Sequence, residues 1–238
     1  MAYLRETANR EFDHWSRTYD RSWLQWMIFH PSHQMMLQQL RASDERLLDI
    51  GCGTGQFLVQ AAHEFSNLGC FGLDLSAKML DQGQERLARV GDQVTVVRGD
   101  SERLPFADGS FDVVTCRHSF HHYPRQQAAV AEMFRVLRPD GRLLLIDGNR
   151  DRLWGWLVFD VAVTTIEGGV HHCSGLELRA LFRKMGWRKV VASSDLFRLA
   201  GFAQVEQFSR RGLAPFLMTK GVAAKSTKQF VLPAARAA

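Results

Sequence analysis

The sequence has few cysteines and none of the spacings that bind zinc. Its 238 residues contain four cysteines, at positions 52, 70, 116 and 173, and no two of them form a C-x-x-C pair. We therefore expect no metal site. Cys52 and Cys70 lie among small or apolar residues and Cys116 ends an apolar run, so we expect buried, reduced thiols and a cytoplasmic location.

Long apolar runs are also missing. The most apolar stretch, residues 153–166, is interrupted by Asp160, and it is too short to cross a bilayer, which needs about 20 apolar residues. The first ten residues carry charges of both signs and no apolar core, so we expect no secretory signal. With 46% apolar and 23% charged residues, the composition is that of a globular protein long enough to bury a core unaided.

Acidic residues are absent from the last segment. Residues 220–238 contain four basic residues and no acid, whereas the net charge of the whole chain is +5. Such a tail could touch anionic lipid or nucleic acid, but a solvated tail is the favoured interpretation. No RNA-binding module accompanies it, so we expect no nucleic-acid partner.

Short apolar runs alternate with helical patterns from residue 46 onward. Residues 1–42 have aromatic residues at helical spacing, and Pro31 is expected to start a second helix. Strands are predicted at 46–50, 70–73, 94–98, 111–116 and 142–147, and helices at 56–64, 77–89 and 125–138, with Ser76 as an N-cap. Further helices are predicted at 152–166 and 176–185 and closing strands at 188–192 and 213–219, while residues 196–211 fit no element. This alternation predicts an α/β fold with a parallel sheet and helices on both faces.

The chemical centre is the segment Asp49-Ile50-Gly51-Cys52-Gly53-Thr54-Gly55-Gln56. It follows a predicted strand and opens a predicted helix, whose free N–H groups attract an anion. A dinucleotide-binding loop would have glycine at position 56, and a P-loop would have Gly-Lys-Ser/Thr. Neither pattern is present, which disfavours a nicotinamide oxidoreductase.

Acidic residues follow the next two predicted strands. Asp74 ends one of them, about 20 residues after the glycines, where nucleotide-binding folds place a ribose-binding acid. Asp100 follows the other strand. With the glycine loop and the segments 104–112 and 132–142, these residues resemble the class I S-adenosylmethionine (SAM) methyltransferases, in particular the group that contains the ubiquinone and menaquinone biosynthesis enzymes. The resemblance is close over residues 45–148 and weaker at 12–20 and 171–192, and it departs from the family at 138–141, where Gly-Gly is more usual.

The resemblance implies a Rossmann-like, doubly wound, mostly parallel sheet of seven strands with helices on both faces, an N-terminal helical element and a cap after the fifth strand. One methyltransferase domain is expected over residues 1–219, with a helical lid at 1–42, a SAM-binding half at 45–148, a substrate cap with closing strands at 149–219, and a basic tail at 220–238. The implied cofactor is SAM, and the implied binding residues are Asp49, Gly51, Gly53, Thr54, Asp74, Leu75, Asp100, Ser101 and Arg117. Arg117 would line the sulfonium side, where its charge repels the donor, so we expect it to point at the methionine carboxylate or at substrate.

A general base is needed only when the methyl acceptor must lose a proton. His118, His121, His122 and Tyr123 follow the fourth predicted strand, whose end faces the ligand crevice. His121 is the first choice among them, and His171, in a later loop, is the second candidate. Local packing of these histidines is the plain alternative.

Two aromatic segments lie outside the cofactor half. Trp15, Tyr19, Trp23, Trp26 and Phe29 could cover the site, and Trp154, Trp156 and Phe159 follow the fifth predicted strand. Both suit a flat or lipophilic small-molecule acceptor such as a quinol, a phenol or a lipid, and peripheral membrane contact would suit a lipid. The same aromatics could instead only fill the core. The alternatives to a small-molecule methyltransferase are a non-catalytic SAM- or nucleotide-binding regulatory module, a phospholipid N-methyltransferase at a membrane surface, and RNA methylation.

Overall fold

The computed structural model describes residues 16, 20–21, 29–148, 202–208 and 216–223. The first part of the chain forms α2 (His30–Leu37), β1 (Arg46–Ile50), α3 (Gln56–Glu64), β2 (Gly69–Asp74) and α4 (Ala77–Ala88). The 3-10 turn η2 (Gly91–Gln93), β3 (Val94–Arg98), β4 (Phe111–Arg117), the turn η3 (Phe120–His122), α5 (Gln126–Val136) and β5 (Leu137–Gly148) follow. The sheet is completed by β6 (Phe202–Phe208) and β7 (Phe216–Ala223).

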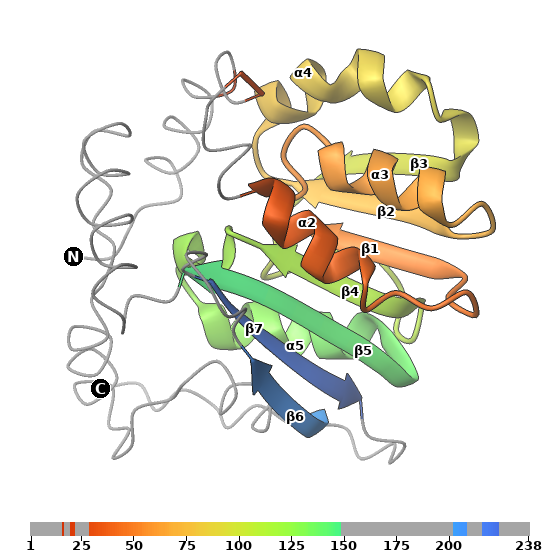
Figure 1. Cartoon of the computed structure of the whole chain (residues 1–238). Helices are drawn as coiled ribbons and strands as arrows, with labels where there is room; N and C mark the ends of the chain where they lie inside the picture. The colour runs from red at the N-terminus through yellow and green to blue at the C-terminus, as the bar shows by residue number, and fades with distance from the viewer. Residues whose placement is uncertain (1–15, 17–19, 22–28, 149–201, 209–215, 224–238) are drawn as a thin grey trace.

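The seven strands form one mixed sheet in the order β3-β2-β1-β4-β5-β7-β6 (Figure 1). Neighbouring strands among β1 to β5 pair in parallel, whereas β7 is antiparallel to both β5 and β6. The chain runs outward from β1 to β2 and β3, then returns to place β4 on the other side of β1. Such a reversal opens a crevice at the carboxyl ends of the two central strands, where ligands bind in α/β sheets.

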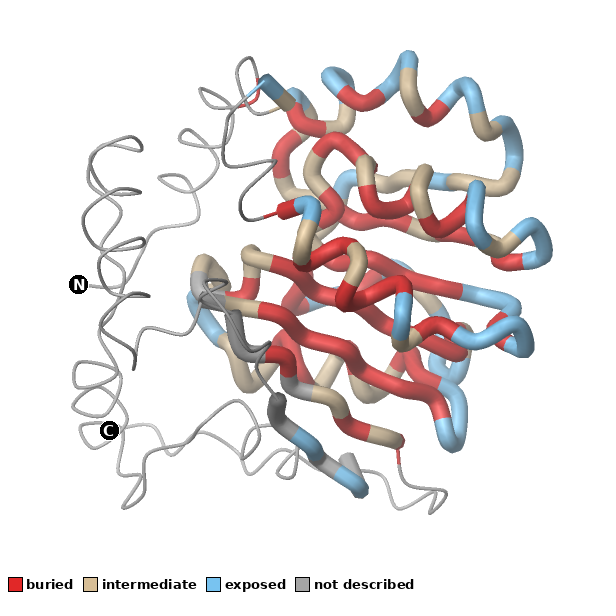
Figure 2. Tube along the Cα trace, viewed as in Figure 1, coloured by how far each residue is buried: buried red, intermediate tan, exposed pale blue. Residues whose placement is uncertain are grey.

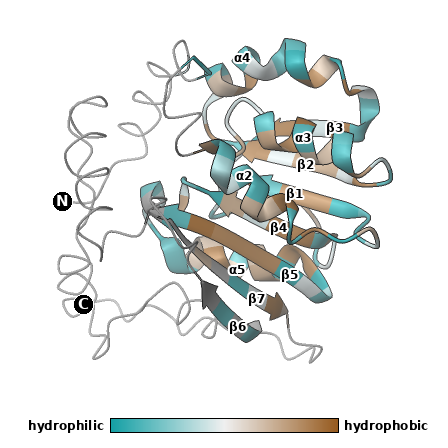
Figure 3. Ribbon diagram, in the orientation of Figure 1, coloured by the Kyte–Doolittle hydropathy of each residue, from teal (hydrophilic) through white to brown (hydrophobic). Residues whose placement is uncertain are grey.

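Two apolar layers cover the sheet. α2 and α3 pack on one face, around a cluster that includes Met36 and Phe57, and α5 packs on the opposite face, around one that includes Met133 (Figure 1). All seven residues of β4 are buried, as the red tube of the central strands shows in Figure 2. The central part of β5 is apolar, whereas α4 carries many hydrophilic residues (Figure 3). Strands buried on both faces need continuous apolar runs, which explains why the central strands were readable from the sequence.

Most predicted elements between residues 30 and 148 are confirmed. β1, α3 and β3 have the predicted bounds. Ser76 caps α4 by accepting a hydrogen bond from the backbone N–H of Met79 at 3.2 Å. Pro31 lies in the first turn of α2. Cys52, Cys70 and Cys116 are buried free thiols, as expected.

The end of the chain differs from the prediction. β6 occupies part of the segment 196–211, which fitted no element, and β7 starts at Phe216 instead of residue 213. β7 runs to Ala223, so the sheet includes residues 220–223, which were expected to belong to the basic tail. Lys220, Gly221 and Val222 pair with β5 and Ala223 pairs with β6, and this pairing satisfies their backbone groups even though a lysine is among them. The predicted elements at 152–166, 176–185 and 188–192 and the aromatics before Phe29 lie outside the described residues.

Across the described part of the chain, no helix is long and apolar enough to cross a membrane.

Candidate functional site

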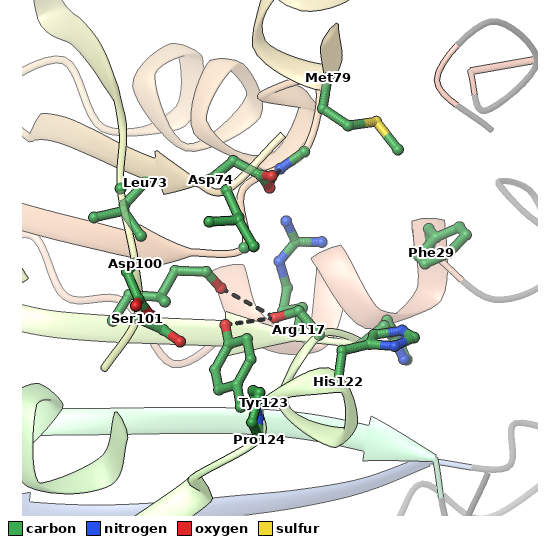
Figure 4. A pocket seen from close by; sticks show the side chains of 17 residues that line it. Phe29, Leu73, Asp74, Met79, Asp100, Ser101, Arg117, His122, Tyr123 and Pro124 are labelled. Atoms are coloured by element: carbon green, nitrogen blue, oxygen red, sulfur yellow. Dashed lines mark hydrogen bonds between the residues drawn. The ribbon is translucent and has the colours of Figure 1, made fainter. Parts of the chain in front are cut away.

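A cleft lies where the carboxyl ends of β1, β2 and β4 meet the loop that follows β3. It holds about 860 Å³ of space, part of it open to solvent. Asp74, Asp100 and Ser101 lie along one side of it, Phe29 and His122 lie on the other, and Arg117 stands between them (Figure 4). We call this the main cleft.

The glycine loop forms the floor of the main cleft. Gly51, Gly53 and Gly55 all have positive φ angles, of 71°, 56° and 72°, which side chains rarely adopt. At Gly51 a Cβ atom would also lie 2.3 Å from Oγ of Ser119. Gly55 is the N-cap of α3 and provides no side-chain cap. The loop thus brings backbone against the cleft and leaves the first amides of α3 without a side-chain acceptor.

Asp74 joins the glycine loop to the start of α4. Its Oδ2 accepts a hydrogen bond from the backbone N–H of Gly53 at 2.7 Å, and its Oδ1 accepts one from that of Ser76 at 2.9 Å. Burial raises the pKa of Asp74, and the two backbone donors oppose this shift only in part. A carboxylate has about four acceptor positions, so each oxygen retains the capacity to accept a hydrogen bond from a ligand hydroxyl.

The wall beyond Asp74 combines polar and apolar groups. Leu75 and Met79 line the main cleft together with Asp100 and Ser101. Oδ1 of Asp100 accepts a hydrogen bond from the backbone N–H of Glu102 at 2.9 Å, which fixes the turn after β3. Such a wall can receive a flat heterocycle between apolar side chains with polar groups at its edge.

Two of the predicted binding residues do not line the main cleft. Asp49 is completely buried below it, where Oδ1 accepts from Oγ1 of Thr115 at 2.7 Å and Oδ2 accepts from Nη2 of Arg117 at 3.0 Å. Asp49 therefore positions Arg117 instead of lining the ligand space. Thr54 is also buried, and it lines a smaller neighbouring chamber. The other predicted residues, Gly51, Gly53, Asp74, Leu75, Asp100, Ser101 and Arg117, all line the main cleft.

The structure describes three of the candidate bases. His118, His122 and Tyr123 line the main cleft. The hydroxyl of Tyr123 lies 3.0 Å from Oγ of Ser119 and 3.5 Å from Sγ of Cys116. Burial raises the pKa of Tyr123 well above its usual value, which disfavours loss of its proton. The side chain of His121 and the whole of His171 lie outside what the structure describes.

Sequence reasoning assigned no binding role to Met79 or Ser119, and it placed Phe29 only in a possible lid. Phe29 lines the cleft just before α2, with its ring edge-on to that of His118 at 5.3 Å. Met79 lies in the first turn of α4, directly after the strand that carries Asp74. The signal in the sequence that could have identified Met79 is its position three residues after Ser76, the predicted N-cap of the helix that follows Asp74.

Comparison with known proteins agrees with this geometry. Residues 48–145 match the model of a family described as a methyltransferase domain. The chain is 35% identical to a demethylmenaquinone methyltransferase of Lactiplantibacillus plantarum over 136 residues, which cover 53% of this chain and 57% of that protein. A protein of the same name from Listeria monocytogenes is 27% identical over 221 residues, covering 87% of this chain and 92% of that one. The alignments span about half of the first two curated relatives, 57% of one and 46% of the other.

Solved structures show the same fold. A SAM-dependent methyltransferase of Thermotoga maritima, described as a possible histamine N-methyltransferase, has a TM-score of 0.64 at 22% identity and covers 90% of this chain and 98% of its own. YcgJ of Bacillus subtilis has a TM-score of 0.53 at 24% identity and covers 83% of this chain and 100% of its own. At these identities the likeness supports the arrangement of helices and strands.

Proposed function

The chain belongs to the class I SAM-dependent methyltransferases, and from this premise we propose that it transfers a methyl group from SAM to an O, N or C atom of a small aromatic or lipophilic acceptor. The observation that carries the proposal is the main cleft, which the glycine loop, Asp74 and the turn at Asp100 line together. The family implies SAM as the methyl donor.

The residues of the wall fit the nucleoside part of SAM. Asp74 keeps acceptor positions that suit the two ribose hydroxyls, because its present bonds use only part of its capacity. Leu75 and Met79 offer apolar contact for the two faces of adenine, and Asp100 and Ser101 offer polar groups for its edge. Gly51 is suited to close approach of the ligand, since its backbone carries no side chain.

SAM supplies an activated methyl group on a sulfonium, so the residues of the chain mainly need to align donor and acceptor and exclude water. Phe29 and His118 form an aromatic wall on the acceptor side. His118 and His122 are the described histidines that could take a proton from an ionisable acceptor, while His121 and His171 stay candidates on sequence grounds. Base catalysis of this kind contributes about 10²- to 10⁴-fold.

A quinol is the acceptor class that we favour. It is flat and lipophilic, which suits the ring of Phe29 and the aromatic-rich sequence at 153–159, and relatives at 27–35% identity carry the name demethylmenaquinone methyltransferase. Contact with a membrane surface through the basic tail would help such an acceptor to enter, because quinols of this kind reside in lipid.

The test is turnover with purified protein. We expect incubation with SAM and a reduced demethylnaphthoquinone to give S-adenosylhomocysteine and a product heavier by one methylene, both detected by mass spectrometry. Binding of S-adenosylhomocysteine without turnover of any quinol or phenol would exclude this acceptor class, and absence of turnover in a whole metabolite extract would favour a regulatory module. Stronger binding of NADH than of SAM would exclude the proposal altogether.

A further inference from the structure

A chain of hydrogen bonds ties the loop after β4 to the glycine loop. Oγ of Ser119 donates to the backbone carbonyl of Ile50 at 3.2 Å, directly before Gly51. The hydroxyl of Tyr123 lies 3.0 Å from the same Oγ, as a dashed line in Figure 4 shows, and Sγ of Cys116 lies 3.2 Å from it. Three side chains from the end of β4 and the loop after it therefore converge on one carbonyl of β1.

The number of available hydrogens fixes the direction of this chain. A serine hydroxyl has a single hydrogen, and Ser119 donates its hydrogen to Ile50. Tyr123 must therefore donate to Ser119, while the thiol of Cys116 is left to donate to one of the two hydroxyls. Burial raises the pKa of Tyr123, which favours the protonated phenol that this direction requires.

The two hydroxyls lie directly against the glycine loop. A Cβ atom at Gly51 would lie 2.3 Å from Oγ of Ser119 and 3.2 Å from the hydroxyl oxygen of Tyr123. Gly51, Ser119 and Tyr123 also line the main cleft. The loop after β4 is thus held against the segment at which we place the methyl donor.

Each of these anchored residues is next to a histidine of the same loop. His118 directly precedes Ser119, and His122 directly precedes Tyr123. His118 has a φ angle of 48°, which residues other than glycine rarely adopt, and its backbone N–H donates to the carbonyl of Ile146 at 2.9 Å. Such a conformation persists only where the surrounding structure holds it, and the bond of Ser119 to β1 is one such restraint.

We propose that Tyr123 and Ser119 are positioning residues for methyl transfer, because their bonds to the carbonyl of Ile50 fix the distance between the donor and the histidines beside the acceptor. This assignment rests on the proposed function and deepens it. The donor lies at the glycine loop and the acceptor beside His118 and His122, so a shift of the loop after β4 changes the alignment of the two reactants. Misplacement by about 1 Å can cost about 100-fold in rate. Neither hydroxyl exchanges a proton with the substrate in this role.

The experiment removes the two hydroxyls one at a time. Formation of S-adenosylhomocysteine from SAM and a reduced demethylnaphthoquinone gives kcat and KM, and calorimetry gives the affinity for S-adenosylhomocysteine. We expect Tyr123→Phe and Ser119→Ala each to lower kcat about 10- to 100-fold and to leave the KM for SAM and the affinity for S-adenosylhomocysteine unchanged. Because both hydroxyls act through one chain of bonds, the double variant should lose less than the product of the two single effects.

Ser110→Ala is the matched control. Oγ of Ser110 also donates to a backbone carbonyl, that of Ala107 at 2.7 Å, but Ser110 precedes β4 and lies at the end of the strand away from the cleft. The control should keep the kcat of the wild type. Urea denaturation of all the variants shows whether each remains folded, and Tyr123→Phe, which keeps the ring, decides the matter if Ser119→Ala does not fold.

Two results would overturn the proposal. One is a Tyr123→Phe variant with native kcat, which would leave the hydroxyl a structural role only. The other is a fall in kcat accompanied by an equal loss of affinity for S-adenosylhomocysteine, which would show that the bonds hold the donor site and not the alignment. Absence of turnover in the wild type would instead overturn the proposed function, and this assignment with it.

Discussion

Asp20 and Arg86 form an ion pair of 2.6 Å that closes around the glycine loop. Oδ1 of Asp20 also accepts from Oγ1 of Thr54 at 2.8 Å and from Nε2 of Gln56 at 2.7 Å. Arg86 donates from Nη1 to the backbone carbonyl of Thr54 at 3.0 Å. A residue near the N-terminus and a residue of α4 therefore hold the same loop from two sides.

The first prediction concerns this clamp. The Asp20–Arg86 pair is partly exposed, with side-chain exposures of 20% and 31%, so we expect a modest effect on folding. Asp20→Ala and Arg86→Ala should each weaken binding of S-adenosylhomocysteine by roughly 5-fold, since a typical hydrogen bond contributes about 1 kcal/mol. Because both residues hold Thr54, the double variant should lose less binding free energy than the two single variants lose together. A double-mutant cycle on the binding affinities measures this difference. Full additivity would show that the two residues act independently.

A second prediction separates backbone strain from steric conflict. Gly51→Ala forces an L-residue to φ 71° and places a Cβ atom 2.3 Å from Oγ of Ser119. Gly91→Ala has a similar φ of 60°, but nothing lies within 4 Å of the added Cβ. We expect Gly91→Ala to cost about 1–2 kcal/mol from the left-handed conformation alone. Gly51→Ala should lower the free energy of unfolding by more than this, as measured by urea denaturation, and should also weaken S-adenosylhomocysteine binding. Equal losses of unfolding free energy at the two positions would contradict the predicted clash with Ser119.

A third prediction concerns Asp74 as the ribose-binding acid. Asp74→Ala removes a charged acceptor, so nucleoside affinity should fall about 10- to 150-fold, equivalent to about 1.5–3 kcal/mol. Asp92→Ala, in the exposed turn η2, is the matched control and should have native affinity. The measurement is calorimetric titration with 5′-methylthioadenosine, which contains the ribose, and native affinity of Asp74→Ala would refute the assignment.

The fourth prediction follows from the raised pKa of Asp74. The folded pKa is higher than the ordinary 3.8, so the buried carboxylate costs stability at neutral pH, and this cost disappears as the pH falls through the folded value. Binding has the opposite sign, because the protonated group loses acceptor capacity. We expect the affinity for 5′-methylthioadenosine to decrease on acidification while the pH is still above 3.8, with near-ultraviolet circular dichroism confirming that the protein remains folded. The Asp74→Asn variant should lack this pH dependence. If the affinity of the wild type does not change down to pH 3.8, Asp74 does not bind the ribose as proposed.

The last prediction contrasts two ion pairs of different burial. Arg142 and Asp44 pair at 2.6 Å with side-chain exposures of only 4% and 2%, and they tie the segment before β1 to β5. Asp44→Ala leaves a buried arginine uncompensated and should cost about 3–5 kcal/mol of unfolding free energy. Asp108→Ala breaks the pair with Arg135, in which Asp108 is 81% exposed, and should cost less than about 1 kcal/mol. Urea denaturation measures the loss of unfolding free energy in both variants. Similar losses would show that burial does not decide how much an ion pair contributes to stability.

The sequence by itself determined the parallel half of the fold and which residues follow the carboxyl ends of its strands. A strand buried on both faces, such as β1, requires a continuous apolar run, and helix caps and glycine turns depend on neighbouring residues, so β1, α3 and Ser76 could be located from local pattern alone. The acids Asp74 and Asp100 were found for the same reason, since each directly follows a readable strand.

Only the tertiary structure decided what the residues of the site contact. Asp49 and Arg117 are 68 positions apart and form a buried pair only because β1 and β4 are neighbours in the sheet. Asp20 reaches the glycine loop from 34 positions away. Strand β7 pairs with β5, which is distant in the sequence, and β6 joins the sheet only through β7. Contacts of long sequence separation depend on how the chain packs, and no local pattern of residues encodes them.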